Sequence, residues 1–335
     1  MQLLATTGRL LNRKTKNHFF TMKAKALIIL LFLTAFHFSA TGNPGKNDIH
    51  PKHDAASLVM HALSARAHNY PSTNNTMNAF YKERVEKNNS CITVNEAILD
   101  VNKASYLNSK RDVVAIRDIR GNCTPGKNDD LLVKLQGGPL SALELDVVKY
   151  PFLGTFSHKI DESYEFEYAK SEKHGNREFY VVSFTQKPSD SRILYRGNIF
   201  IEKNSLAIGK IEYSMNVENR EWSYDNFFVK RPKGSKVQMI SASYVVNYRE
   251  YDGKWYYDYS TSDIKFNLMN PKDNTYDIYS VSTQMAVTTL IADNLTIDKK
   301  NMLKSKDVLT DKVMDHKIAS EWDIYNLIML MAANF

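Results

Sequence analysis

The chain has 335 residues, of which 43% are hydrophobic and 24% are charged, a composition typical of a folded globular protein. The formal net charge is +7, but residues 1–40 contain six basic residues and no Asp or Glu, which leaves 38 basic against 37 acidic residues in the rest of the chain. Nucleic-acid binding needs clustered positive charge, so this balance argues against a nucleic-acid partner.

The N-terminal segment has the pattern of a secretory signal peptide. Lys23 and Lys25 precede an uncharged apolar run, Ala26–Phe36, and small residues follow up to Gly42. This order of basic, apolar and small residues is typical of a cleaved leader. The run has 11 residues, fewer than the roughly 20 that span a bilayer as helix. We predict that residues 1–40 are a signal peptide; a retained anchor and a buried helix are the alternatives.

The leader prediction sets the expected domain boundaries and location. Translation can start at Met1 or at Met22, which would make a compact signal start. Residues 41–53 are polar and predict a linker, and residues 54–335 predict a single β-rich domain. The body contains no second apolar run long enough to span a membrane, so we expect no transmembrane helix in the mature chain. We expect an exported protein, in the periplasm or associated with an outer membrane.

Three segments have helical patterns. Asp54–His68 carries an apolar stripe at helical spacing, with Asp54 in place to cap it. Leu140–Val148 follows Pro139, a residue favoured at the first helical position. The apolar segment Trp322–Ala332 predicts a terminal helix.

Strands dominate from Cys91 onward. Apolar and polar residues alternate in segments that recur every 10 to 15 residues or so, separated by turn residues. Asp252-Gly253 lies between two such segments and is the strongest short hairpin signal, because both central residues of that turn need positive φ. The pattern predicts a β-rich α+β fold: a large, curved antiparallel sheet, a half-barrel-like meander, with a few helices.

Cys91 and Cys123 are the only cysteines, and cysteines of exported proteins often pair. Cys91–Lys103 and Lys110–Cys123 both have the composition of strands, and a symmetric hairpin centred near Leu107 places the two cysteines opposite each other. Opposed residues at a non-hydrogen-bonded pair have Cα atoms about 4.5 Å apart, which a disulfide can bridge. Cys91 and Cys123 are therefore the candidates for a disulfide; the alternative is two unrelated thiols, because a slip of one residue removes the pairing.

Aromatic residues are the most distinctive feature of the strands. Trp255, Tyr257 and Tyr259 alternate along one predicted strand, and Tyr244 and Tyr248 alternate along its hairpin partner. Side chains two apart share a face of a strand, so these five residues predict an aromatic surface. It is either a packed core or the concave lining of a site for a lipid-like ligand, and we take the five as candidate ligand-binding residues.

The sequence contains no convincing catalytic or metal-binding motif, so we assign no catalytic residue, metal or cofactor. His50 and His53 are three apart, but they lie in the polar linker without a neighbouring ligand cluster. Glu165 and Glu167 share a strand face and are the candidates for a hydrolase that acts on glycans or peptides. Such an enzyme needs two carboxyl groups facing each other across a cleft, and a solvated sheet face is the alternative.

Nine short motifs follow one another in the chain: NYP at 69–71, AFYKER at 79–84, NEAILD at 95–100, DDLLVKLQGGP at 129–139, LDVVK at 145–149, YRGNIFIEKNSL at 195–206, YVVNYRE at 244–250, GKW at 253–255 and WDIY at 322–325. In this order they resemble exported bacterial proteins known as carboxypeptidase-like regulatory-domain-containing proteins. The resemblance covers roughly residues 54–326. It implies no peptidase chemistry, because the regulatory β-sandwich of those proteins is not expected here, and it supplies no catalytic residues.

The segment Gly197–Met215, two strands joined by a lysine-asparagine turn, is locally similar to lipoprotein-carrier half-barrels. Such proteins wrap a curved sheet around helices and an apolar cavity. The leading hypothesis is therefore a non-enzymatic binding or assembly module for lipid-like or envelope components, with a lipid-like ligand or an envelope protein as its partner. The hydrolase above and a structural or surface-interaction protein are the alternatives.

Overall fold

A computed structural model describes residues 54–123, 134–135, 138–150, 160–190, 192–217, 228–230, 234–270, 272–291, 297 and 299–314. The predicted signal peptide, the linker and the predicted terminal helix lie outside these residues. All described residues except 174–176 belong to one compact unit, Asp48–Lys173 with Arg177–Ile318.

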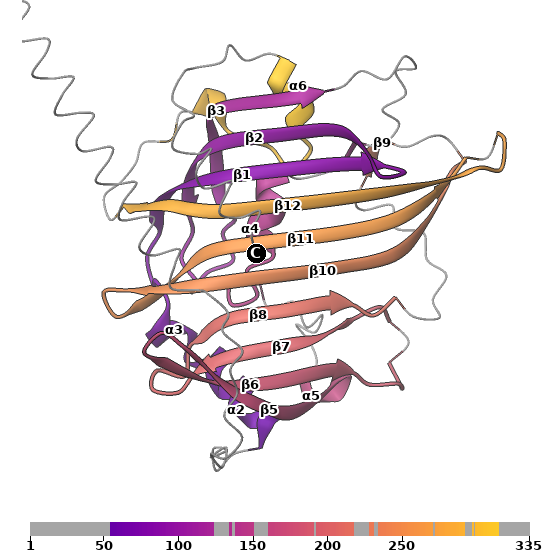
Figure 1. Cartoon of the computed structure of the whole chain (residues 1–335). Coiled ribbons are helices and arrows are strands. Elements are labelled where there is room, and N and C mark those ends of the chain that lie inside the picture. Colours follow the sequence, from indigo (N-terminus) through magenta and orange to yellow (C-terminus); the bar gives the residue numbers. More distant parts are fainter. Residues whose placement is uncertain are drawn as a thin grey trace, which may run out of the picture. The chain divides into compact units, whose positions relative to one another are not determined.

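Ten strands form one open, curved sheet in the order β3-β2-β1-β12-β11-β10-β8-β7-β6-β5 (Figure 1). The registered pairs within it are antiparallel, and β1 beside β12 joins the two ends of the described chain. This confirms the predicted β-rich, half-barrel-like meander. The strands are β1 (Asn75–Lys87), β2 (Ser90–Lys103), β3 (Val113–Cys123), β5 (Tyr164–His174), β6 (Arg177–Gln186), β7 (Tyr195–Glu202), β8 (Ile208–Met215), β10 (Lys236–Tyr251), β11 (Lys254–Met269) and β12 (Tyr276–Ile291).

The hairpin turn between β10 and β11 forms where the sequence predicts it. Asp252 and Gly253 have φ angles of 50° and 72°, the left-handed values that this two-residue turn requires. The three long strands β10, β11 and β12 have 16 residues each and run side by side through the middle of the sheet (Figure 1).

Short helices accompany the sheet: α2 (Ala55–Ser64), α3 (Arg66–Asn69), α4 (Gly138–Glu144), α5 (Ile160–Ser163), α6 (Leu309–Met314) and the 3-10 turn η2 (Lys299–Asn301). A separate two-stranded sheet pairs β4 (Lys134–Leu135) with β9 (Phe228–Lys230). The predicted N-terminal helix is confirmed as α2 and α3, and Asp54 caps it by accepting a hydrogen bond from the Ser57 backbone N–H at 2.9 Å.

The helix α4 is shorter than the predicted Leu140–Val148. It ends at Glu144, and the following segment turns so that the fully buried Asp146 points inward. An ionised side chain buried at this position needs a partner, and the turn brings Asp146 to Lys103. No helix in the described part of the chain is long and apolar enough to cross a membrane.

The register between β2 and β3 differs from the predicted hairpin. Thr93 lies opposite Cys123, whereas Cys91 pairs with Glu86 of β1. The predicted register is wrong by two residues, because the connection after β2 is asymmetric and Arg117 is an extra residue in β3. Cys91 has a free, exposed thiol, so the predicted Cys91–Cys123 disulfide is not formed in this structure.

Candidate functional site

One row of side chains runs straight across the sheet from β6 to β3. Each member lies opposite the next in the strand register, so all share the face that packs against α4, called here the inner face. With strands about 4.8 Å apart, the row extends roughly 38 Å. This cross-strand row consists of Phe184, Gly197, Tyr213, Tyr244, Ser262, Thr283, Glu83, Asn95 and Gly121.

The β1–β2 end of the row is polar. The hydroxyls of Ser262 and Thr283 are 2.8 Å apart, and the buried Glu83 carboxylate accepts hydrogen bonds from Tyr81 (3.1 Å) and Asn95 (3.3 Å). The same Asn95 amide donates to Thr310 of α6 at 2.9 Å, which ties that helix over this end. Burial raises the pKa of Glu83 above its ordinary value, and the two donated hydrogen bonds oppose the rise.

The other end of the row is aromatic. The rings of Tyr213 and Tyr244 stack with centroids 4.9 Å apart, and Tyr195 meets both rings edge-on at 5.4 and 6.5 Å. Tyr164 meets Phe184 edge-on at 5.7 Å, and Phe166 lies 6.4 Å from the same ring. The aromatic patch is defined as Tyr164, Phe166, Phe184, Tyr195, Tyr213 and Tyr244.

The aromatic patch reaches the surface at the end of the sheet. Tyr213, Tyr244 and Phe184 are buried, whereas Tyr195 and Phe166 are half-buried, as is the neighbouring Tyr168 on β5. The half-buried rings are in contact with buried rings and are partly exposed to solvent. Such a surface can pack against an apolar ligand in the same way as it packs against the protein core.

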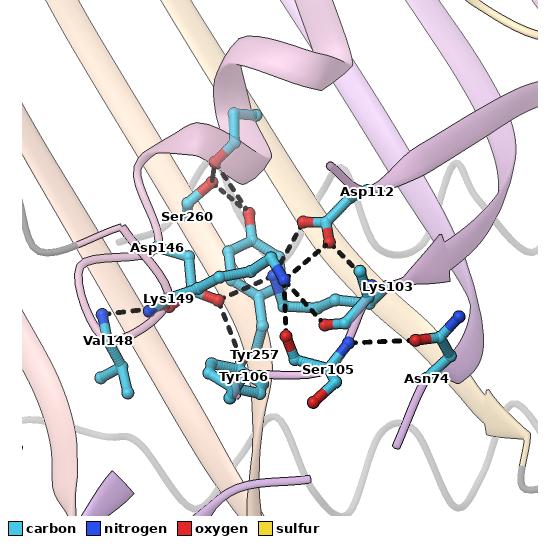
Figure 2. A network of polar contacts seen from close by, with 12 residues as sticks. Asn74, Lys103, Ser105, Tyr106, Asp112, Asp146, Val148, Lys149, Tyr257 and Ser260 are labelled. Atoms are coloured by element: carbon cyan, nitrogen blue, oxygen red, sulfur yellow. Dashed lines mark hydrogen bonds and ion pairs between the residues drawn. The ribbon is translucent and has the colours of Figure 1, made fainter. Parts of the chain in front are cut away.

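A buried ionic cluster lies elsewhere on the inner face (Figure 2). Lys103 Nζ is 2.7 Å from Asp146 Oδ2 and 3.0 Å from Asp112 Oδ2, and all three side chains are almost completely buried. Lys149 Nζ lies 3.7 Å from Asp112 Oδ1 and also donates to two backbone carbonyls of the 104–112 connection. The polar clasp is defined as Lys103, Tyr106, Asp112, Asp146, Lys149 and Tyr248.

Two tyrosines complete the polar clasp. The hydroxyls of Tyr248 and Tyr106 donate to the two carboxylate oxygens of Asp146 at 2.7 and 2.8 Å. Burial and then the charge of Asp146 raise the pKa of both phenols, so they stay protonated donors. Burial lowers the pKa of an amine, but for Lys103 the two carboxylates more than offset this, and the net pKa is raised.

The polar clasp is balanced in charge, with two lysines against two aspartates. Its members come from β2, from the β2–β3 connection, from the turn after α4 and from β10. These groups bond to one another, which is the pattern of a buried network that fixes a packing arrangement. We assign the polar clasp a structural role: it holds the connecting segments against the inner face.

The structure separates the five predicted ligand-binding residues. Tyr244 belongs to the aromatic patch, and Tyr248 belongs to the polar clasp. The hydroxyl of Tyr257 lies 2.6 Å from that of Ser260 and 3.4 Å from the carbonyl oxygen of Ala142 in α4.

Trp255 and Tyr259 lie apart from these three. Trp255 is buried edge-on against Phe179 at 6.4 Å, with the Arg177 guanidinium 5.3 Å above its ring. Strict alternation predicts that Tyr259 shares a face with Trp255, and this prediction is wrong. The extra residue Asp258 forms a bulge and moves Tyr259 to the outer face, opposite Asn247.

Glu165 and Glu167, the hydrolase candidates, are exposed on the edge strand β5. The residues between and after them, Phe166 and Tyr168, are the half-buried ones. The two carboxylates therefore lie on the solvated side of the strand, which is the alternative that the sequence left open for them. Within the described residues, no group of three or more His, Cys, Asp or Glu side chains is placed to hold a metal ion.

Sequence reasoning missed most of both clusters. Nothing in the sequence spacing of the four charged residues of the polar clasp indicates that they meet, so the sequence alone suggests ordinary surface charges. These residues are Lys103, Asp112, Asp146 and Lys149. Tyr195 and Tyr213 are signalled by alternation within their strands, but their contact with Tyr244 depends on the order of β7, β8 and β10 in the sheet.

Comparisons with known proteins give no assignment. No protein-family model matches the sequence, and no curated protein matches it. A LolA superfamily protein from Nitrosomonas europaea is 8% identical over 75% of this chain and 98% of its own, with a TM-score of 0.22. A DUF1329 family protein from Desulfovibrio piger is 11% identical over 70% and 94%, with a TM-score of 0.26.

A structure of lipovitellin, which describes lipid–protein interactions, is also similar. It is 7% identical over 72% of this chain and 28% of the lipovitellin chain, with a TM-score of 0.28. TM-scores this low establish neither fold nor function. The resemblance to the carboxypeptidase-like regulatory-domain family is not shown by these comparisons.

Proposed function

We propose that this protein is a non-enzymatic binding module that holds a lipid-like ligand against the aromatic patch. The proposal rests on one observation, the exposure of the rings on one sheet face. Tyr213 and Tyr244 are buried there, whereas Tyr195 and Phe166 are half-buried. Large rings bury much apolar area with little loss of side-chain freedom, so such a surface suits an acyl chain.

The proposal places the protein outside the cytoplasm, in the periplasm or at an outer membrane. The apolar leader Ala26–Phe36 with Lys23 and Lys25 supports export. A carrier or assembly module for envelope components needs export from the cytoplasm and an apolar binding site. The leader and the aromatic patch together therefore favour such a module over a structural or surface-interaction protein.

Titration with a fluorescent fatty acid, cis-parinaric acid, tests the proposal directly. We expect saturable binding to the wild type and clearly weaker binding to Tyr195→Ala, because this change removes a half-buried ring of the patch. Tyr276→Ala is the matched control, since this tyrosine is 62% exposed on β12. The proposal fails if the wild type does not bind the probe, or if both variants bind it as the wild type does.

A further inference from the structure

The hydroxyl of Tyr164 is buried, and no group in the described part of the chain accepts its proton. Tyr164 is the first residue of β5 and only 1% exposed, and its ring contacts Phe184 and Phe166 within the aromatic patch. Burial raises the pKa of this phenol, so it remains a neutral O–H donor. The backbone N–H of Tyr195 opposes that rise, but an N–H is itself a donor and cannot accept the hydroxyl proton.

A buried hydroxyl whose proton has no acceptor is unusual in a folded protein, where most buried polar atoms find a partner. Phenylalanine would fill the same space in the patch without the penalty of an unmade hydrogen bond. Three other buried tyrosines follow the ordinary pattern: Tyr70, Tyr106 and Tyr248 each donate to a carbonyl or carboxylate oxygen.

We infer that the Tyr164 hydroxyl recognises an acyl oxygen of the ligand, either a carboxylate or an ester oxygen. The inference rests on the proposed function and adds the chemistry of the group at the end of the chain. The free O–H needs an acceptor, and the rings of Phe184 and Phe166 beside it select an apolar body. A fatty acyl compound offers both in one molecule, whereas a hydrocarbon or a protonated amine lacks the acceptor.

The neighbouring charges fit an acyl oxygen in either form. Arg192 donates to the Ser163 hydroxyl at 2.9 Å, one residue before Tyr164, and also pairs with Asp190 at 2.5 Å. The net charge of the Arg192–Asp190 pair is zero, so the pair neither requires nor repels a negatively charged carboxylate on the ligand. The site is therefore expected to take both the acid and its ester.

Three probes separate the hydroxyl contact from apolar binding: cis-parinaric acid, its methyl ester and the oxygen-free diphenylhexatriene. They are titrated into the full-length protein and its Tyr164→Phe variant. We expect the variant to bind the acid about tenfold and the ester about fivefold more weakly, because a hydrogen bond to a charged acceptor is the stronger one, and to bind diphenylhexatriene unchanged.

The unfolding midpoint of each variant shows whether weaker binding comes from a less stable fold. Tyr164→Phe removes a buried O–H that has no acceptor and should leave the unfolding midpoint unchanged or higher. Tyr70→Phe removes a hydroxyl bonded to the Ile208 carbonyl at 2.7 Å and should lower it. Equal acid affinity in the wild type and Tyr164→Phe would overturn the inference while the proposed function stands. No binding of any probe to the wild type would overturn both.

Discussion

The Tyr248 hydroxyl donates a hydrogen bond to Asp146 Oδ1 at 2.7 Å, and so joins β10 to the turn after α4. The opposite oxygen of the same carboxylate is 2.7 Å from Lys103 Nζ. Asp146 therefore connects the turn after α4, to which it belongs, with both β10 and β2. Its removal is expected to loosen all three.

We expect Asp146→Asn to lower the free energy of unfolding by about 3 to 5 kcal/mol, because removing one partner leaves Lys103 with an incompletely compensated buried charge. Urea denaturation measures the loss. Glu178→Gln is the control: this carboxylate lies 3.3 Å from Lys203 but is 57% exposed, so the change should be small. Comparable losses in the two variants would show that the polar clasp does not stabilise the fold.

Glu83 should make stability depend on pH in a direction opposite to that of most paired carboxylates. Its pKa is raised in the folded protein above the ordinary value of 4.5, chiefly by burial. The folded state therefore binds the proton more tightly than the unfolded state. The resulting stabilisation is fully present below pH 4.5 and is lost as the pH rises through the folded pKa.

The comparison of the wild type with Glu83→Gln isolates this contribution, since other carboxylates such as Asp54 and Asp273 have lowered pKa values and cancel in the difference. We expect the unfolding free energy of the wild type, minus that of the variant, to fall with rising pH above 4.5. A difference that is flat, or that rises, would contradict the assignment of Glu83 as a buried carboxyl with a raised pKa.

The sequence was sufficient to predict the class of fold. Period-two alternation and the Asp252-Gly253 turn come from local backbone preferences, so they can be read without knowledge of distant contacts. The same alternation misplaced Tyr259, because the bulge at Asp258 adds one residue and inverts every later side chain. Arg117 has the corresponding effect in β3 and contributes to the failure of the cysteine prediction.

The candidate site was predictable only in part. Aromatic alternation in the sequence marks the strand of Tyr244, but nothing in the sequence distinguishes Tyr164 from the other strand aromatics. The importance of Tyr164 comes from a buried hydroxyl whose proton has no acceptor, which depends on the three-dimensional arrangement of β5 and β6. Lys103 is a stronger case, since a lysine in an alternating strand is normally solvated and only the folded structure brings two aspartates to it.

Cys91 should react rapidly with a thiol reagent in the native state, because its thiol is free and exposed. Labelling with iodoacetamide without reductant or denaturant, followed by peptide mass spectrometry, measures this. A Cys91→Ser variant provides the blank for the assignment. Recovery of a Cys91 peptide linked to Cys123, with no label on either, would restore the disulfide that the β2–β3 register argues against.

The hydrogen bond between Asn95 and Thr310 should hold α6 against β2 and β3. It joins a buried amide of the cross-strand row to the second residue of a six-residue helix, which is too short to be stable without tertiary contacts. Val313 of the same helix packs beside Gly121, the last member of the row. Thr310→Val removes the hydrogen bond but keeps the shape of the side chain.

Limited trypsin digestion at Lys312 measures the local opening of α6. A net hydrogen bond of about 1 kcal/mol corresponds to roughly a fivefold change in the open population, so cleavage of Thr310→Val should be about fivefold faster. Thr275→Val is the control, because this threonine is bonded within the exposed β11–β12 turn. Unchanged cleavage at Lys312 would mean that apolar packing alone holds α6, and that Asn95 serves Glu83 and not the helix.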